Sequence, residues 1–390
     1  MDHLRPISGL HPIFLEETLM LFLATAAFGL EGVVAGELRR LGYHATAVNG
    51  GAEFEGTFED AMRANLFLRC ADRVLLIVGR FEARTFEELF DGVLKLPWET
   101  YLDVNSRFPV SGNCARSQLM SVSDCQSITK KAIVNRLKAK YHLDWFQESG
   151  ATVPISVTLH GNIARLAIDT SGEALNRRGY RTWNGEAPLR ETLAAALVDL
   201  SPWRPGMPLC DPFCGTGTLL IEAAYKMSHR APGLTRTFAM ESFPGVSSEM
   251  SKRLRDLAAQ EFQPERIQNI FGSDIDPEAI RLAKKHIVQA GIGGLIKVSV
   301  SDMKDVSPEQ PNGVFLCNPP YGERLSDRKS CEALYRSMSH LLRQNSGWSL
   351  CVITSHPQFE RCIGMRASKK RRFYNGRLEC EYMIFEPKSK

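Results

Sequence analysis

Short apolar or alternating segments and amphipathic segments follow one another from Leu21 to about position 170. In the first amphipathic segment, apolar residues from Leu30 to Leu38 recur at the spacing of one helix face. The pair Gly161-Asn162 predicts a tight turn between two strands. Such interleaving is typical of small α+β modules. We expect strands at 21–25, 51–58, 73–81, 108–112, 154–161 and 163–170. We expect helices at 28–43, 59–69, 85–96 and 123–142, the last opened by Ser123 or Asp124.

A different pattern begins after position 188. A helix is expected from Pro188, followed by five buried strand segments that are separated mostly by helices. That order predicts a parallel, doubly wound sheet. The last segment, 369–386, reads as two strands around Asn375-Gly376, which is a strong hairpin signal. A parallel sheet closed by an antiparallel hairpin is typical of class I (Rossmann-like) methyltransferases, so we expect seven mostly parallel strands. The five buried strands are expected at 207–211, 269–274, 296–302, 313–318 and 349–355.

Composition and charge narrow the class of protein. Apolar residues make up 44% and charged residues 24% of the 390 positions, which excludes a disordered or fibrous chain. No window approaches about 18 uninterrupted apolar residues, so no membrane helix is expected. Residues 1–104 carry 9 basic and 16 acidic side chains, whereas the rest of the chain carries 39 and 28. The excess of basic side chains after residue 104 suggests that this part of the chain binds a polyanion.

Ten cysteines are scattered along the chain without any CxxC pair. A zinc ribbon is therefore not expected, and we predict no metal site. Many of the cysteines lie in apolar runs, as expected for reduced core thiols of a cytoplasmic protein. The apolar stretch from Ile13 is interrupted by Glu16 and Glu17, so we interpret residues 1–19 as a loosely attached extension rather than a signal peptide.

The first candidate for ligand binding is a glycine-rich turn from Asp211 to Gly217, between an expected strand and an expected helix. Glycines at 215 and 217 let the backbone approach a ligand at a helix N-terminus. The turn lacks the GxGxxG spacing and the lysine of nucleotide-binding loops. It suits the zwitterionic tail of an adenosylmethionine better than a triphosphate.

Two aspartates end the next strands. Asp274 stands where an acid can accept hydrogen bonds from both ribose hydroxyls, and Ile275 can pack on a purine. Asp276 precedes a proline and is better explained as a helix cap. Asp302 could accept the adenine amino group. Because 57 positions separate Gly217 from Asp274, against about 20 in a nucleotide-binding unit, we expect an insertion within 228–268.

The most specific motif is the turn Asn318-Pro319-Pro320-Tyr321 after the fourth strand. The two prolines stiffen the turn and leave the preceding carbonyls free to accept hydrogen bonds from an exocyclic amine. The Asn318 amide can accept another, and Tyr321 offers a ring for stacking a flipped base. Nothing in the sequence offers a partnered serine or cysteine nucleophile, and His286 and His356 are interpreted as structural or surface residues.

These motifs resemble those of S-adenosylmethionine (SAM)-dependent N-methyltransferases. The segments at 28–43, 169–181, 187–197, 229–234 and 369–381 narrow the resemblance to THUMP-domain RNA methyltransferases that modify guanine N2 in bacterial 23S ribosomal RNA. The resemblance runs from about Leu21 to the end of the chain. It implies a ferredoxin-like region at 20–56, a THUMP RNA-binding domain at 57–168 and a methyltransferase domain at 169–390. Some members carry a second methyltransferase domain, which we expect this chain to lack.

The resemblance also implies roles for residues. The SAM set is Asp211, Phe213, Cys214, Gly215, Gly217, Asp274, Ile275, Asp302, Met303 and Asn318. The base-binding and catalytic set is Asn318, Pro319, Pro320 and Tyr321. The charge pattern, rather than the resemblance, supplies the candidates for RNA contact. Two basic clusters within 107–140 and 361–377 contain Lys130, Lys131, Lys138, Lys369, Lys370, Arg371 and Arg372. A charge run can also be an ordinary solvated face.

Several functions remain open at this point. Adenine-N6 and glutamine-N5 methyltransferases share the turn at 318–321, although the RNA module argues against both. A tRNA guanine is an alternative substrate. A protein that binds RNA without catalysis is the alternative from a different class.

Overall fold

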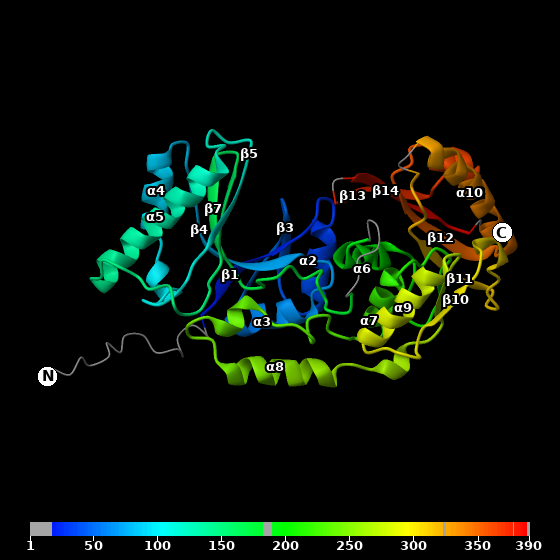
Figure 1. Ribbon diagram of the computed structural model, residues 1–390, viewed down its shortest axis with the longest axis horizontal. Helices are drawn as coiled ribbons and strands as arrows, with labels where there is room; N and C mark the ends of the chain where they lie inside the picture. Colours follow the sequence, from blue (N-terminus) through cyan, green and yellow to red (C-terminus); the bar gives the residue numbers. More distant parts are fainter. Residues whose placement is uncertain (1–17, 182–188, 323–324, 377, 388–390) are drawn as a thin grey trace.

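The computed structural model describes residues 18–181, 189–322, 325–376 and 378–387. The expected extension therefore lies almost entirely outside the described residues, as does Pro188. The molecule is elongated and carries one seven-stranded sheet toward each end (Figure 1). Helices accompany both sheets as the sequence predicts, so the α/β fold class is confirmed. No helix in the described part of the chain has the length and apolar character needed to cross a bilayer.

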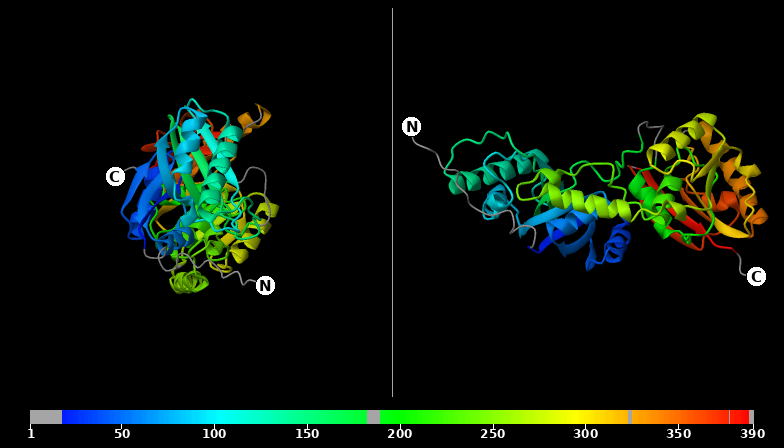
Figure 2. Two further views of the ribbon diagram at one scale, coloured as in Figure 1. Left: turned by 90° about the vertical axis from the view of Figure 1, so that its left-hand side faces the viewer. Right: turned by 90° about the horizontal axis from the view of Figure 1, so that it is seen from below.

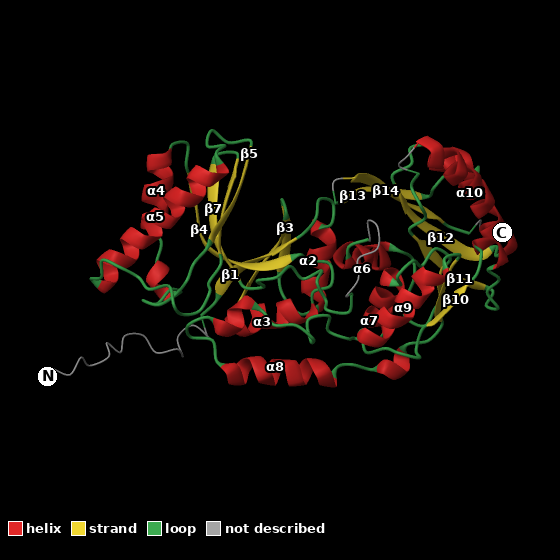
Figure 3. Ribbon diagram, viewed as in Figure 1, coloured by secondary structure: helices red, strands yellow, loops and turns green. Residues whose placement is uncertain are grey.

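The secondary structure follows the expected order along the chain (Figure 3). The strands are β1 (Met20–Thr25), β2 (Ala45–Val48), β3 (Gly51–Gly56), β4 (Arg73–Glu82), β5 (Val110–Ala115), β6 (Ile155–His160), β7 (Ile163–Asp169), β8 (Leu209–Asp211), β9 (Ile270–Asp274), β10 (Lys297–Val300), β11 (Asn312–Cys317), β12 (Gly347–Thr354), β13 (Lys369–Asn375) and β14 (Leu378–Phe385). The helices are α2 (Glu31–Arg40), α3 (Phe58–Phe67), α4 (Phe86–Leu94), α5 (Val122–Tyr141), α6 (Glu191–Leu200), α7 (Thr218–Met227), α8 (Ser248–Gln260), α9 (Pro277–Gln289), α10 (Leu325–Gln344) and α11 (Phe359–Ile363).

The N-terminal sheet runs in the order β2-β3-β1-β4-β7-β6-β5. Only β5 and β6 pair in parallel; the other neighbours are antiparallel. Phe22 of β1 stands opposite Phe54 of β3, and the two rings stack with centroids 5.5 Å apart. This buried pair anchors one face of the sheet. Helix α5 begins one position after its N-cap Ser121, so the expectation of Ser123 or Asp124 is wrong by two or three residues.

The C-terminal sheet has the order β10-β9-β8-β11-β12-β14-β13. Strands β8 to β12 are parallel, while β14 runs antiparallel to both β12 and β13. The order reverses between β8 and β11, which creates the crevice where ligands of open α/β sheets bind. The mostly parallel sheet and the closing antiparallel pair were both predicted from the sequence.

The predicted insertion within 228–268 is present and contains α8. This helix lies along α3 of the N-terminal half, as two directions of view show (Figures 1 and 2). Its N-cap Ser247 accepts a hydrogen bond from the backbone N–H of Met250. The insertion therefore connects the part of the chain that forms the C-terminal sheet with the N-terminal half, through contacts between α8 and α3.

The described part of the expected linker, 171–181, is not an exposed connection. Ser171, Arg178 and Tyr180 are buried. Arg178 pairs with Glu222 of α7, and both side chains are almost completely buried. A buried pair of this kind is costly to break from one side. Arg178 also donates to the carbonyl of Arg69, so the segment connects the C-terminal portion to the N-terminal half.

Candidate active site

A cavity of about 350 Å³ lies at the carboxyl ends of the parallel strands. Its size falls within the usual range for small-molecule sites. We call it the donor cavity. It is lined by Leu189, Asp211, Pro212, Phe213, Cys214, Gly215, Thr216, Thr218, Leu219, Asp274, Ile275, Asp302, Met303, Asn318, Pro320 and Leu334. Of the residues singled out from the sequence for SAM and the target base, only Gly217, Pro319 and Tyr321 are outside this lining.

The glycine turn is held in a conformation that favours glycine. Gly215 has φ +49° and Gly217 has φ +86°, in the left-handed region that other residues seldom adopt. Gly217 caps α7, and its N–H donates to the Cys214 carbonyl at 2.7 Å. The turn therefore brings main-chain groups and a helix N-terminus to the wall of the donor cavity.

Asp274 ties the turn to the end of β9. Its Oδ2 accepts from the Gly215 N–H at 2.9 Å, and its Oδ1 accepts from the Asp276 N–H at 3.0 Å. Asp276 in turn accepts from the Glu278 N–H at 2.9 Å and caps α9, as predicted. Asp274 thus holds the shape of two loops while its carboxylate lines the donor cavity.

Asp211 is the buried carboxyl of the site, with 1% of its surface exposed. Its Oδ1 accepts from the Phe213 N–H at 3.0 Å. Burial raises the pKa of Asp211 well above its usual range, and the charge of Asp274 adds to the shift. A cationic ligand in the donor cavity would offset both effects.

Asp302 and Met303 form the far wall. The Asp302 side chain caps a short 3₁₀ turn and accepts from the Lys304 N–H at 3.0 Å. Met303 is buried, whereas Ile275 is 70% exposed. An exposed apolar side chain beside a buried one offers two apolar surfaces for a planar ring.

The turn after β11 carries an unexpected internal contact. The Tyr321 hydroxyl donates to Asn318 Oδ1 at 2.5 Å, so the tyrosine orients the asparagine amide. The Tyr335 hydroxyl donates to the Pro320 carbonyl. That carbonyl is therefore engaged. Within this turn, the acceptors that remain at the cavity are those of Asn318, namely its side-chain amide oxygen and its main-chain carbonyl.

The sequence did not single out six residues of the lining, or the support that His286 gives to the glycine turn. The six are Leu189, Pro212, Thr216, Thr218, Leu219 and Leu334. His286 of α9 is fully buried, and its Nδ1 lies 3.2 Å from the Thr216 carbonyl in the glycine turn. Burial lowers the pKa of His286, which favours the neutral ring. The position of His286 on the buried face of an amphipathic helix could have marked it as structural but not as a support for the turn.

The ten cysteines are free thiols, and eight of them are buried. Burial raises the pKa of the Cys214 thiol, and the charges of Asp211 and Asp274 raise it further. A thiol of raised pKa is a poor nucleophile at neutral pH. The contribution of Cys214 to the donor cavity is therefore its shape.

The candidate RNA lysines and arginines lie on two separate elements, α5 and β13. Helix α5 is at the end of the elongated molecule opposite to the C-terminal sheet (Figure 1). Most of these cations have acidic neighbours: Lys130 pairs with Glu148, Lys369 with Glu386, Lys370 with Glu360 and Arg372 with Glu379. These pairs are largely exposed and weak, so the side chains remain available to a polyanion.

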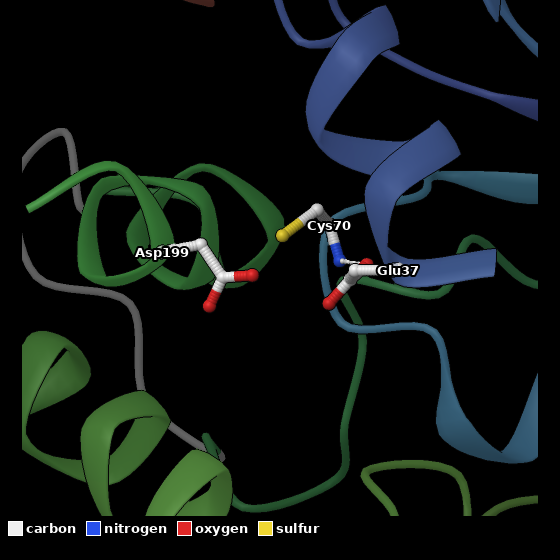
Figure 4. A group of neighbouring side chains, drawn as sticks. All are labelled: Glu37, Cys70 and Asp199. Carbon is white, nitrogen blue, oxygen red and sulfur yellow. Dashed lines mark hydrogen bonds between the residues drawn. The ribbon is translucent and has the colours of Figure 1, made fainter. Parts of the chain in front are cut away.

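One group of side chains has the spacing of metal ligands, namely Glu37, Cys70 and Asp199 (Figure 4). The carboxylates already have partners, because Glu37 Oε2 accepts from the Cys70 N–H at 2.8 Å and Glu37 pairs with Arg69 at 3.2 Å. Asp199 pairs with Arg69 at 2.7 Å, and Arg40 and Lys226 also reach it. Burial raises the pKa of Cys70, which opposes the thiolate a metal would need. The group is an ion-pair network between the two halves of the chain.

A family model described as the RMKL-like methyltransferase domain matches residues 178–384, which is more than half of the chain. The chain belongs to the RMKL-like methyltransferase family. Models of the RlmL ferredoxin-like domain and of the THUMP domain match residues 21–75 and 83–169 of this RMKL-like methyltransferase. The family predicted from the sequence motifs is thus confirmed.

The RMKL-like methyltransferase has relatives over nearly its full length. A Bacillus subtilis protein named "Putative RNA methyltransferase YpsC" is 41% identical, and the alignment covers 92% of this chain and 94% of that protein. The Ribosomal RNA large subunit methyltransferase K/L of Psychromonas ingrahamii is 36% identical over 93% of this chain. The chain spans about half of that relative, 49% of its length.

Two solved structures superpose closely on this fold. The Listeria monocytogenes protein described as a "predicted N6-adenine-specific DNA methylase" has a TM-score of 0.91 and 42% identity, covering 97% of this chain and 98% of its own. SMU.472, solved in complex with SAH, has a TM-score of 0.90 and 39% identity, covering 96% of this chain and 100% of its own. SAH is the demethylated product of SAM, and SAM is the methyl donor of this RMKL-like methyltransferase.

The residues present fit that donor. The left-handed glycine turn presents main-chain donors, the buried Asp211 complements a cationic group, and Asp274 supplies a carboxylate at a strand end. When bound, SAM supplies an electrophilic methyl group.

Proposed function

We propose that this chain is an RNA methyltransferase that acts on the exocyclic N2 amine of a guanosine, with 23S ribosomal RNA as its substrate. The proposal rests on one juxtaposition: Asn318 and Pro320 line the same cavity as Gly215 and Asp274. An amine held by the 318–321 turn would thus face the site assigned to the methyl donor.

We assign individual residues the roles that the family resemblance implies, and the lining of the donor cavity supports most of them. Main-chain groups around Gly215 would hold the methionine end of SAM, and Asp274 would hold its ribose. Asp302 and Met303, with Ile275, would hold the adenine. We assign Gly217 an indirect role, because it caps α7 and shapes the turn without lining the donor cavity.

The chemical difficulty lies with the guanine amine, whose lone pair is delocalised into the ring. Asn318, which lines the donor cavity, would accept the amine's hydrogen bonds through its Oδ1 and its main-chain carbonyl and so localise that lone pair. Positioning of this kind can contribute about 7–11 kcal/mol. The amine's proton would pass to solvent after transfer, so no strong general base is required beforehand.

The RNA module favours RNA over other substrates. A THUMP domain model matches this chain, and the K/L relative from Psychromonas ingrahamii is named for ribosomal RNA. The Listeria neighbour is named for adenine and DNA, and an adenine amine would meet the same acceptors. A glutamine substrate has no use for an RNA module.

The decisive experiment is nucleoside mass spectrometry of ribosomal and transfer RNA from cells lacking the gene. We expect loss of one N2-methylguanosine from 23S RNA, restored by the wild-type gene and not by an Asn318→Ala variant. Loss of N6-methyladenosine would show that the substrate is adenosine instead of guanosine. A change confined to tRNA would show that the substrate is not 23S RNA. Unaltered RNA would instead favour a protein that binds RNA without modifying it.

A further inference from the structure

A second cavity, of about 1180 Å³, lies where the segment after β7 meets the segment 234–239. It adjoins the donor cavity: Arg181 lines the second cavity and donates to the hydroxyl of Thr218, which lines the first. Two consecutive residues also connect the cavities, because Leu189 lines the donor cavity and Arg190 lines the second one. We call the second one the arginine cavity. Its arginines are Arg177, Arg178, Arg181, Arg190, Arg236 and Arg255.

The arginine cavity carries an excess of positive charge. Four carboxylates pair with its arginines: Glu173, Glu191, Glu222 and Glu241. Six guanidinium groups against these four leave a net charge of +2. No carboxylate of the described residues pairs with Arg190, which is exposed.

Arg236 shows how the fold concentrates this charge. Its guanidinium donates to the carbonyls of Ala174 at 2.6 Å and of Arg177 at 3.3 Å, so main-chain oxygens hold it in place. Burial lowers the pKa of Arg236. The charge of Glu173 opposes this shift, whereas the positive charges of Arg178 and Arg73 add to it. A cluster of cations held against one another is stabilised by an anion.

The lining also has donors to spare. Among the described residues, the buried Nε atoms of Arg181 and Arg236 have no hydrogen-bond partner. Unpaired buried donors are costly. These two atoms are covered by protein and do not themselves contact a ligand, but the guanidinium groups that line the arginine cavity suit phosphate oxygens.

We propose that the arginine cavity binds phosphate groups of the RNA strand that flanks the target nucleotide. The inference rests on the proposed function, because it takes the substrate to be RNA. It also explains how one RNA strand can contact both the N-terminal and the C-terminal half of the elongated protein. The arginine cavity lies where the two halves meet, beside the donor cavity. Phosphate contacts position a strand without choosing its sequence.

The test uses the full chain and the exposed arginines, whose substitution leaves the core intact. The double variant Arg177→Gln/Arg190→Gln is compared with wild type for binding of transcribed 23S RNA at several salt concentrations. The double variant should show a lower slope of log affinity against log salt. The decrease should be about 0.7 for each of the two side chains that binds a phosphate of a single strand. Affinity for SAM, measured by calorimetry, should not change.

A matched control is Arg266→Gln. Arg266 is exposed and precedes β9, at the edge of the sheet opposite to the donor cavity. This variant should bind RNA with the wild-type slope. A double variant with the wild-type slope would overturn the arginine cavity as a phosphate site, even if methylation of guanosine is observed.

A photo-crosslinking amino acid separates this inference from the proposed function. Placed at Thr237, an exposed residue of the arginine cavity, it should capture the transcribed RNA. Placed at the exposed Gln268, on the opposite edge, it should not. Crosslinks at Thr237 would support the cavity even if the modified base proves not to be guanine, whereas equal capture at both positions, or none at Thr237, would reject it.

Discussion

The Tyr321 hydroxyl donates a hydrogen bond to Asn318 Oδ1 at 2.5 Å. The two residues lie in one four-residue turn, yet only the asparagine lines the donor cavity. Tyr321 is partly buried, and burial raises its pKa, so its proton stays on the hydroxyl at neutral pH. The tyrosine therefore orients the amide that we assign to the target amine, and its ring contributes less to the cavity than the sequence predicted.

Tyr321→Phe is expected to slow methyl transfer without weakening SAM binding. The variant keeps the ring and removes one hydrogen bond, which is worth about 0.5–1.5 kcal/mol. We expect kcat to fall by roughly threefold to tenfold, because the Asn318 amide loses its fixed orientation. Single-turnover methylation of RNA measures the rate, and calorimetry measures SAM affinity.

Asn318→Ala provides the comparison for that variant. It should abolish turnover and retain SAM binding. If Tyr321→Phe and Asn318→Ala were equally inactive, the tyrosine would have a role beyond orienting the amide.

Asp274→Ala should weaken SAM binding. The carboxylate accepts from the N–H groups of Gly215 and Asp276 and is assigned to the ribose, so its removal loosens the turn and deletes a charge-assisted interaction. Such interactions are worth about 1.5–3 kcal/mol, which corresponds to roughly 10-fold to 150-fold in affinity.

The adjacent Asp276→Ala is the matched control. Asp276 caps α9, and loss of a cap costs about 1 kcal/mol of stability. It should lower the melting temperature slightly and leave SAM affinity near the wild-type value. Equal SAM affinities for the two variants would remove Asp274 from the donor site.

The sequence predicted the parts of the site that depend on strand ends. Asp211, Asp274, Asp302 and Asn318 each end or follow a strand, and parallel strands bring such ends to one edge. The local sequence pattern was sufficient to place these residues at strand ends, and it was also sufficient to predict that Asp276 caps a helix.

Contacts between distant segments were beyond the sequence. The expected linker is polar and glycine-containing, which is typical of exposed chain, yet Arg178 is buried against Glu222. No local pattern marks a pair separated by 44 positions. Strand β2, Ala45–Val48, was also missed, because four residues at a sheet edge give too short an alternation to recognise.

SAM binding should depend on pH through Asp211. Its raised pKa means that the free protein holds a proton on this carboxyl above the usual range for aspartate. A positively charged donor favours the ionised form, so binding expels the proton. Affinity should therefore rise with pH up to the raised pKa and level off above it.

Calorimetry in two buffers with different ionisation enthalpies measures the proton released on binding. Asp211→Asn should bind SAM more weakly and release no proton. Asp302→Asn should preserve the release, since Asp302 lies on the far wall. Proton release by the Asp211→Asn variant would mean that another group titrates.

Asp199→Ala should destabilise the fold. Burial opposes ionisation of Asp199, but the charges of Arg69 and Lys226 outweigh it and lower the pKa of the carboxyl. Removing it leaves Arg69 buried without its closest anion, at a cost of about 3–5 kcal/mol. Stability from this group is lost in the wild type only when the pH falls below the usual aspartate range.

Denaturant unfolding of Asp199→Ala measures this cost. The control is Glu278→Ala, which breaks an exposed pair with Arg281 and should produce no measurable change. Chelators should not alter the melting temperature of the wild-type protein if the group of Glu37, Cys70 and Asp199 is an ion-pair network. Stabilisation by added zinc would contradict that interpretation.

The lysines of α5 lead to the last prediction. Lys130 Nζ lies 2.9 Å from Glu148 and over the ring of Phe108, and Lys131 lies over the ring of Phe90. Adjacent residues do not share a helix face, so one strand of RNA is not expected to meet both equally. Lys130→Gln/Lys131→Gln should weaken RNA binding and lower its salt slope by about 0.7–0.9 for each phosphate that the variant no longer binds.

Glu148→Gln should act in the opposite direction, because it frees Lys130 from a competing carboxylate. The methylated nucleotide should be the same in both variants, since phosphate contacts carry affinity and the base is chosen in the donor cavity beside Asn318. RNA affinity at several salt concentrations, together with mapping of the modified position, measures both effects. Wild-type slopes in both variants would show that α5 does not contact RNA. The phosphate contacts would then be expected at β13 and in the arginine cavity.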